Sequence, residues 1–383
     1  MYDAHRWFDL RDAVRGKNVP PLYLGAVAAA FNNVEDAEKY LNRAIRHAST
    51  PEEANEAREV LANLYMLHGR RREAVRQFDE ILRAKPGRPD VQNARAILSA
   101  LGRNQDQSIV YRHRASFGCM VSDRGFIMPL SINGKTVNWS LDTGFNFTSS
   151  ASESEARMLG LTIQDASALA EDLAGGSIGV RTATAERLVI GGMEIRNVPM
   201  LVFPDSQPPW NSLPPGKRGA VGLPIAIALQ TLRWTANGRC ESSIPTKTKR
   251  NGSGEMNLCF DGLTPLTRVQ FGDKLLDFIL DTGNQAGTQL WARFAEDFAA
   301  LVREGGSKGT KRITQIGGGN DREIVILPEV RFRVGGLETA LRPANIFSKP
   351  VGNDLQHGNL GLDVLTQANE VSIDFRSMSI ALH

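Results

Sequence analysis

The 383-residue sequence has little cysteine, no long apolar run and no excess of charge of one sign. Three cysteines allow one disulfide at most, which excludes a small scaffold held together by several disulfides. A membrane-spanning helix needs about 18 consecutive apolar residues, and without such a run we expect no membrane span. The 45 lysines and arginines against 42 acidic residues leave a net charge of +3, spread along the chain. This distribution argues against nucleic acid as a partner.

Motifs for a metal or a nucleotide are also missing. The six histidines show no metal-ligand spacing, so we expect no metal site. Gly134-Lys135-Thr136 lacks the leading glycine of a phosphate-binding loop, and Gly317 to Gly319 does not open a helix after a strand. We therefore expect no cofactor.

The cysteines bear on the compartment in which the protein works. Cys240 and Cys259 bracket a polar, glycine-containing loop, and a disulfide between them would suit an oxidising compartment. Two free thiols are the alternative, and we expect Cys119 to be a small buried residue of a strand. Residues 1–20 lack the apolar core of a signal peptide. A mature or trimmed form, from which such a peptide was removed, is the alternative interpretation. We expect an extracytoplasmic location, periplasmic or secreted, with the cytoplasm as the alternative.

Glycine is present in excess and is unevenly placed. Glycine makes up 36 of the 383 residues, or about 9%, whereas its average share in proteins is about 7%. Few lie in residues 1–101, where apolar residues return at helical spacing. After residue 102, glycine pairs separate short runs of alternating apolar residues, which are typical of strands. The sequence thus predicts an all-α domain over 1–101, a linker over 102–114 and an all-β region beyond it.

The helical region repeats itself. A shift of 37 residues carries one apolar helix face onto a second, namely Ala37, Leu41, Ala44 and Ile45 onto Ala74, Phe78, Ile81 and Leu82. Thr50-Pro51-Glu52-Glu53 between the units has the pattern of a helix start. The repeat loosely resembles the tetratricopeptide repeat over about two units, with flanking helices at 6–14 and 91–101. This resemblance implies a surface that docks a partner protein or peptide, and helices that stack for stability alone are the alternative.

The β region contains one tripeptide twice, as Asp142-Thr143-Gly144 and as Asp281-Thr282-Gly283. Alternating apolar residues place each copy at the end of the second strand of a hairpin. The first hairpin is predicted to turn at Asn133-Gly134 and the second at Gly272-Asp273. A single Asp-Thr-Gly is usually a capped turn, but two copies in matching contexts indicate a duplication.

The chain after each tripeptide supports this interpretation. A helix is predicted over 152–160 after the first copy and over 291–302 after the second. Glycines with apolar neighbours, Gly222 and Gly361, lie 80 residues after the two aspartates. The region therefore reads as two all-β lobes that are offset by 139 residues.

These motifs resemble the aspartic proteases, specifically the bacterial retropepsin-like group with two lobes on one chain. The resemblance covers about residues 115–383 and implies a bilobed acid-protease fold with its site between the lobes. It divides the region into lobe 1 (115–239), an interlobe loop (240–259) and lobe 2 (260–383). It further implies that one chain holds a complete site, so that a monomer would be active.

The two aspartates are the expected catalytic pair. Neighbouring carboxylates cannot both ionise at low cost, so one keeps a proton. The charged member activates a water molecule, and the protonated member donates to the carbonyl oxygen of the substrate. The sequence does not assign these roles between Asp142 and Asp281. The resemblance gives a supporting role to the other residues of both turns: Thr143, Gly144, Thr282 and Gly283.

Flaps over the substrate are expected from the same resemblance. The glycine-rich segments are 173–179, with Gly175 and Gly176, and 316–320, with Gly318. Glycine would serve the motion of a lid that excludes water. Ordinary hairpin tips are the alternative.

The residue after each tripeptide departs from the family pattern. Family members have alanine or serine there, whereas this chain has Phe145 and Asn284. Both are candidates for substrate contact, and the ring of Phe145 is expected to narrow the cleft.

The sequence thus predicts an aspartic endopeptidase that acts on peptides or proteins, with the helical repeats recruiting substrate or a partner. Phe145 motivates the alternative, a catalytically weak or inactive peptide-binding protein on the same fold. A third hypothesis makes the repeats an adaptor whose cargo the protease trims.

Overall fold

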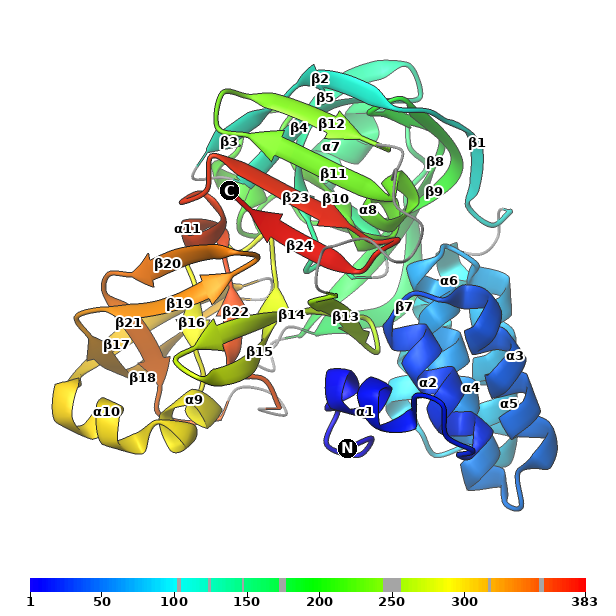
Figure 1. The fold of residues 1–383 in the computed structure, drawn as a ribbon. Helices are drawn as coiled ribbons and strands as arrows, with labels where there is room; N and C mark the ends of the chain where they lie inside the picture. The colour runs from blue at the N-terminus through cyan, green and yellow to red at the C-terminus, as the bar shows by residue number, and fades with distance from the viewer. Residues whose placement is uncertain are drawn as a thin grey trace.

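Six helices at the N-terminus precede two β lobes in the computed structural model (Figure 1). The structure describes residues 1–101, 105–122, 125–146, 148–171, 177–243, 256–315, 318–350 and 355–383. The N-terminal helices, here called the helical module, are α1 (Trp7–Val14), α2 (Pro21–Ala30), α3 (Val34–His47), α4 (Pro51–Leu67), α5 (Arg71–Ala84) and α6 (Pro89–Leu101). None of the helices among these residues is long and apolar enough to cross a membrane.

The module consists of helix pairs whose starts the sequence encodes. The Thr50 side chain caps α4 by accepting the Glu53 N–H at 3.2 Å, and Pro51 occupies its first turn. α2 packs on α3, and α4 packs on α5. Ala37 and Ala74, which the 37-residue shift relates, are both fully buried. The helical repeat is therefore confirmed as two helix pairs, while its tetratricopeptide character stays a prediction.

Lobe 1 is built on one large sheet in the order β1-β9-β6-β10-β5-β4-β8-β7, with β3 paired to β4. Its strands are β1 (Ser108–Arg112), β3 (Met120–Ser122), β4 (Gly125–Ile132), β5 (Lys135–Asp142), β6 (Ser149–Ser152), β7 (Gln164–Glu171), β8 (Ser177–Ile190), β9 (Met193–Phe203) and β10 (Gly219–Gly222). Its helices are α7 (Glu153–Met158), η1 (Trp210–Ser212) and α8 (Leu223–Leu229). The predicted hairpin is confirmed: β4 and β5 turn at Asn133 and Gly134, whose φ angles of 49° and 84° suit a two-residue loop. β1 lies inside the predicted linker.

Lobe 2 repeats this plan in the order β17-β18-β21-β16-β22-β15-β14-β19-β20, with β13 paired to β14. Its strands are β13 (Leu258–Asp261), β14 (Thr264–Phe271), β15 (Lys274–Leu280), β16 (Gln289–Leu290), β17 (Ser307–Gln315), β18 (Gly318–Leu327), β19 (Val330–Val334), β20 (Leu337–Leu341), β21 (Ala344–Phe347) and β22 (Gly358–Leu360). Its helices are α9 (Ala292–Asp297), α10 (Ala299–Gly305) and α11 (Leu362–Leu365). The second predicted hairpin is confirmed as β14 and β15.

The helix predicted after each tripeptide is found in a different form in each lobe. In lobe 1, α7 begins after Ser152, whose side chain accepts the Glu155 N–H at 3.3 Å. In lobe 2 the prediction of one helix over 291–302 is wrong, because the chain breaks at Phe298 between α9 and α10. The Phe298 ring packs 4.7 Å from the rings of both Phe271 and Phe294, which favours this break over a continuous helix.

A third sheet joins the lobes in the order β2-β12-β11-β23-β24. Its strands are β2 (Ala115–Gly118), β11 (Thr231–Thr235), β12 (Arg239–Ser242), β23 (Glu370–Asp374) and β24 (Ser379–Leu382). β2 and β11 lie near the two ends of lobe 1, β12 extends into the predicted interlobe loop, and β23 and β24 end lobe 2. This sheet therefore fixes the two lobes to each other (Figure 1).

The disulfide connects Cys119 and Cys240, not Cys240 and Cys259 as expected. Cys119 follows β2 and Cys240 lies on β12, and these two strands pair in the third sheet. Their Cα atoms are 5.7 Å apart, within the usual reach of a disulfide. Cys259 is a free thiol, buried in β13. Strand pairing between distant parts of the chain therefore decides the partner, and nearness in sequence does not.

Replacing Cys119 and Cys240 by alanine is expected to lower the free energy of unfolding by about 2–5 kcal/mol, because the bond closes a long loop in the unfolded chain. The sequence separation is 121 residues. Urea unfolding of the oxidised parent and the double variant measures the difference. Reduced parent should unfold with the double variant, and an unchanged midpoint would contradict the role of the bond.

The helical module packs against both lobes. One cluster of buried side chains joins Leu98 and Leu101 of α6 to Phe203 and Trp210 of lobe 1. A second cluster joins the start of the chain to lobe 2, through Trp7, Phe8, Ile279 and Trp291. α6 also contacts β7, and α1 contacts β13 (Figure 1). The module is thus part of the same packed body as the lobes.

Candidate active site

Asp142 is the last residue of β5, and Asp281 directly follows the equivalent strand β15. Each of these strands has a parallel strand beside it. β10 pairs with β5, and its last residue, Gly222, lies in register with Asp142. β22 pairs with β15 in the same way, and the Asp281 N–H donates to the Leu360 carbonyl at 3.1 Å. The predicted apolar-glycine elements therefore lie directly beside the ends of the strands that carry the aspartates.

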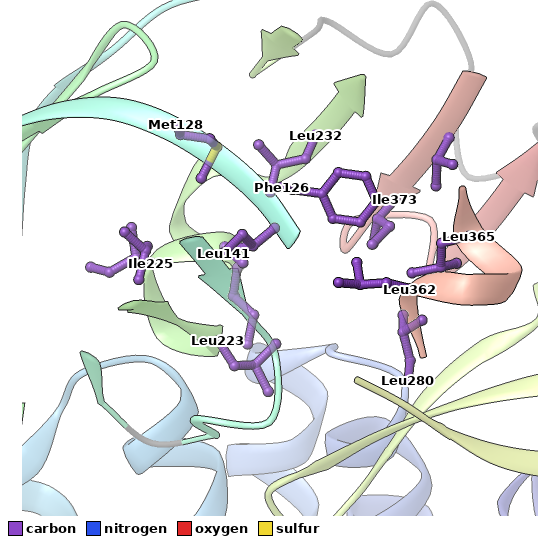
Figure 2. Close-up of a cluster of buried hydrophobic side chains, with 14 of the residues drawn as sticks. Phe126, Met128, Leu141, Leu223, Ile225, Leu232, Leu280, Leu362, Leu365 and Ile373 are labelled. Carbon is purple, nitrogen blue, oxygen red and sulfur yellow. The ribbon is translucent and has the colours of Figure 1, made fainter. Parts of the chain in front are cut away.

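Leucines from both lobes pack beneath the two turns. Leu141 and Leu280 precede the aspartates, and Leu223 and Leu362 follow the neighbouring glycines. All four are at most 4% exposed. Figure 2 shows them converging from lobe 1 and lobe 2 on the space between the lobes. This apolar base holds the two strand ends at a fixed relative position.

The two threonines bind across the lobes. The Thr143 N–H donates to Thr282 Oγ1, and the Thr282 N–H donates to Thr143 Oγ1, both at 3.1 Å. The Thr143 hydroxyl donates to the Leu280 carbonyl at 2.6 Å, and the Thr282 hydroxyl donates to the Leu141 carbonyl at 2.9 Å. Both threonines are fully buried. Four reciprocal hydrogen bonds thus lock one turn to the other.

The glycines of the turns bring the carboxylates together. The Gly144 N–H donates to Asp142 Oδ1 at 2.8 Å, and the Gly283 N–H donates to Asp281 Oδ1 at 3.0 Å. A Cβ on Gly144 would lie 3.0 Å from Oδ1 of both aspartates, so the two oxygens are at most twice that distance apart. A Cβ on Gly283 would lie 2.2 Å from Asp142 Cγ. Only glycine leaves room for the Asp142 carboxylate against the opposite turn.

The surroundings favour a shared proton. Burial, followed by the charge of Asp281, raises the pKa of Asp142 above the usual range of a carboxyl group. Burial also raises the pKa of Asp281. Both side chains keep partial solvent exposure. A proton on one carboxyl and a charge on the other is the favoured state of this pair.

Residues 128–222 match the family model described as aspartyl protease. The chain carries an aspartyl protease fold. Among solved structures it is similar to a retropepsin-like aspartic protease from Rickettsia conorii, at 15% identity, over 35% of this chain and 93% of that chain, with a TM-score of 0.24. No curated protein matches the sequence. The predicted resemblance to aspartic proteases is confirmed for the fold.

Asn359 breaks the symmetry of this site. It lies on β22, and its Nδ2 donates to Asp281 Oδ2 at 3.1 Å. The 139-residue offset places Ala220 at the equivalent position of lobe 1, where no side chain can donate to Asp142. The contact between Asn359 and Asp281 was not predicted, although a polar residue in an otherwise apolar strand indicated a special role at this position. The extra donor favours the ionised form of Asp281.

Two hydroxyl residues support the site from behind, and they were also missed. The Gly222 N–H donates to Ser149 Oγ at 3.1 Å, and the Gly361 N–H donates to Thr288 Oγ1 at 2.9 Å. The offset of 139 residues relates Ser149 to Thr288 as it relates the aspartates, so the duplication was their signal. They anchor the β10 and β22 glycines to the loops that follow the catalytic turns.

Phe145 and Asn284 follow the turns but face different surroundings. The half-buried Phe145 ring lies 6.2 Å from the Phe203 ring and 6.5 Å from the Trp210 ring, in the wall of lobe 1. Asn284 Nδ2 donates to the Gly287 carbonyl at 3.1 Å, within its own loop. Their contact with substrate stays a prediction.

The expected flaps lie on hairpins in equivalent positions of the two lobes. β7 and β8 form the first hairpin, and β17 and β18 form the second. Gly175 and Gly176 lie outside the described residues. Gly318 begins β18 opposite Gln315. The flap function of both hairpins stays a prediction.

Residues that could bind a metal do not gather near this site. In the described part of the chain, no group of three or more His, Cys, Asp or Glu side chains has the arrangement of a metal site.

Proposed function

We propose that the protein is an aspartic endopeptidase that hydrolyses peptide bonds in peptides or proteins. The observation that carries this proposal is the cross-bonded pair of Asp-Thr-Gly turns, which holds Asp142 and Asp281 side by side in one chain. Such a pair can hold a water molecule, deprotonate it and protonate the substrate carbonyl without a covalent intermediate.

Asn359 divides the two roles. Its amide stabilises charge on Asp281, so Asp281 acts as the base that takes a proton from water. Asp142 faces that charge and keeps its proton, so it donates to the carbonyl oxygen of the substrate. Collapse of the tetrahedral intermediate then returns a proton to the leaving amine. The partial exposure of both side chains gives water access to the pair.

Cleavage of an unstructured protein between pH 3 and 7 tests the proposed activity. We expect a bell-shaped dependence of kcat/KM on pH, because Asp281 must be ionised and Asp142 protonated. Activity therefore falls below the lower apparent pKa of the pair and above the upper one. Inhibition by a statine-type transition-state analogue would add support. Absence of cleavage over the whole range would contradict the proposal.

Replacing Asn359 by alanine is expected to move the acidic limb of this profile to higher pH by about one to two units, because a charge-assisted hydrogen bond of about 1.5–3 kcal/mol is lost. Loss of the donor raises the pKa of Asp281, so more of the pair is doubly protonated at low pH. Asn284→Ala is the matched control, since its amide donates to a backbone carbonyl. An acidic limb that stays in place would contradict the assigned roles.

A peptide-binding protein without turnover is the second proposal, and Phe145 is the observation that favours it. Family members have a small residue at this position, whereas the Phe145 ring packs with Phe203 and Trp210 beside the catalytic turn. If Phe145→Ala cleaves a peptide that the parent only binds, this alternative holds. A parent that cleaves at least as fast as the variant would exclude it.

The role of the helical module and the location of the protein are further parts of the proposal. The module would recruit substrate or a partner protein, while the lobes hold a complete site in a monomer. The Cys119–Cys240 disulfide supports an extracytoplasmic location, since such bonds persist in oxidising compartments. Alkylation of the protein in its native source, which distinguishes one free thiol from three, tests this location.

A further inference from the structure

A cavity of about 710 Å³ lies between the helical module and lobe 2. Its volume falls within the range of about 300–1,000 Å³ that is typical of ligand sites. Side chains of α2 and α4 and the segment before α1 form one wall. Phe260, Asp261 and Ile279 of lobe 2 contribute to the other wall. The cavity thus exists only where the module and the protease lobe meet.

One lining residue of the cavity connects it to the strand that leads to Asp281. Ile279, which lines it, lies two residues before Asp281, so alternation along the strand puts both side chains on one face of the sheet. Ile279 is also in register with Asn359, the residue that donates to Asp281. We therefore expect a peptide bound at the aspartates to place a side chain near its scissile bond in this cavity.

Acidic side chains outnumber basic ones in the lining, where His5 is the basic residue. The lining includes Asp3, Glu56, Glu59 and Asp261, and none of the described residues that form it is a lysine or an arginine. Glu59 pairs with Arg88 at 2.8 Å, and Asp261 accepts from His5.

These pairs leave two acidic groups of the lining over, the exposed Asp3 and the half-buried Glu56. No basic residue in the described part of the chain forms an ion pair with Glu56, and the Tyr2 hydroxyl is its hydrogen-bond partner. Burial, followed by the charges of Asp3 and Glu59, raises the pKa of its carboxyl group. Burial and the same carboxylate raise the pKa of Tyr2. A cation in the cavity would stabilise the ionised Glu56.

Aromatic and apolar groups complete the lining. Tyr2, Trp7 and Trp291 contribute aromatic rings to the lining, and aromatic rings attract a cation at short range. Ala26 and Leu64 offer an apolar surface for a hydrocarbon stem. The acidic Glu56, the aromatic rings and the apolar side chains of this cavity are together complementary to a long basic side chain.

We propose that this cavity is a substrate subsite that takes a lysine or arginine side chain flanking the scissile bond. The inference rests on the proposed function for its link to cleavage, but the binding it describes is measurable without turnover. The helical module would then help to select the substrate through its own side chains.

Binding of paired peptides tests the subsite. Dye-labelled peptides that differ in one residue, arginine or its neutral isostere citrulline, are scanned position by position and measured by fluorescence anisotropy with the full chain. At one position we expect about tenfold tighter binding of the arginine peptide, or about 1.4 kcal/mol, with a preference that weakens as salt is added. Glu56→Gln should remove this preference, and Glu56→Lys should reverse it. Glu52→Gln, an exposed carboxylate on the same helix, should retain it.

Each result bears on one proposal. Equal binding of the arginine and citrulline peptides at every position would overturn the subsite, as would equal loss of preference in Glu52→Gln and Glu56→Gln. Thermal unfolding of the three variants shows whether they fold. Cleavage of an unlabelled unstructured protein is scored separately. A preference for arginine without cleavage would support the subsite and count against the endopeptidase.

Discussion

Asp142→Asn and Asp281→Asn are each expected to lower kcat/KM by at least about 10²–10⁴-fold, the range that proton transfer by a positioned group contributes. Asparagine keeps an oxygen that accepts the N–H of Gly144 or Gly283, so the turn is retained. It can neither ionise nor share the proton on which the mechanism depends. Rates with an unstructured protein as substrate, from the parent and both variants, measure the effect.

The matched control is Asp273→Asn, an exposed aspartate at the turn of the β14–β15 hairpin. It should cleave like the parent. Melting of both active-site variants should stay at the temperature of the parent or rise, because the site raises the pKa of both carboxyl groups and so disfavours their ionised forms. Activity that survives in either active-site variant would contradict the assigned chemistry, and so would equal loss in the control.

The strands that carry the aspartates could be predicted because local patterns encode them. Alternation before Asp142 and Asp281 and the turn at Asn133-Gly134 act over a few residues. The duplication then gave a second, independent copy of each pattern, which made a common tripeptide informative. The equal spacing of Gly222 and Gly361 from the aspartates was part of the evidence for this duplication.

Other features depend on contacts between distant parts of the chain. Cys119 meets Cys240 because β2 and β12 pair in the sheet between the lobes, and no local pattern encodes that pairing. Asn359 reaches Asp281 only because β22 runs parallel to β15. Glu155 lies three residues after the N-cap residue Ser152, where a glutamate usually accepts the N-cap N–H, yet its carboxylate accepts from Trp139 Nε1 at 3.0 Å in the core of the lobe. Tertiary packing decides each of these outcomes.

Removal of the helical module is expected to unfold the lobes rather than leave a free protease. A chain starting at residue 105 loses the cover that α1, α2 and α6 give to Phe203, Trp210, Ile279 and Trp291, all at most 8% exposed. Exposing one such side chain costs about 1.5–3 kcal/mol, against a usual total stability of about 5–15 kcal/mol. Solubility and thermal melting of this fragment measure the loss.

A matched pair of point variants tests whether the packing of the module on the lobes stabilises the protein. Trp7→Ala removes a buried ring whose Nε1 donates to Asp261 of lobe 2 at 3.0 Å, and it should cost about 3–5 kcal/mol of unfolding free energy. Tyr40→Ala on α3 should cost much less, since the contact described for this ring is with Lys39, its neighbour in the sequence. Co-expression of residues 1–104 should restore soluble fragment. A fragment that melts with the parent would instead mean that the module is an independent adaptor, joined to a protease that needs no support from it.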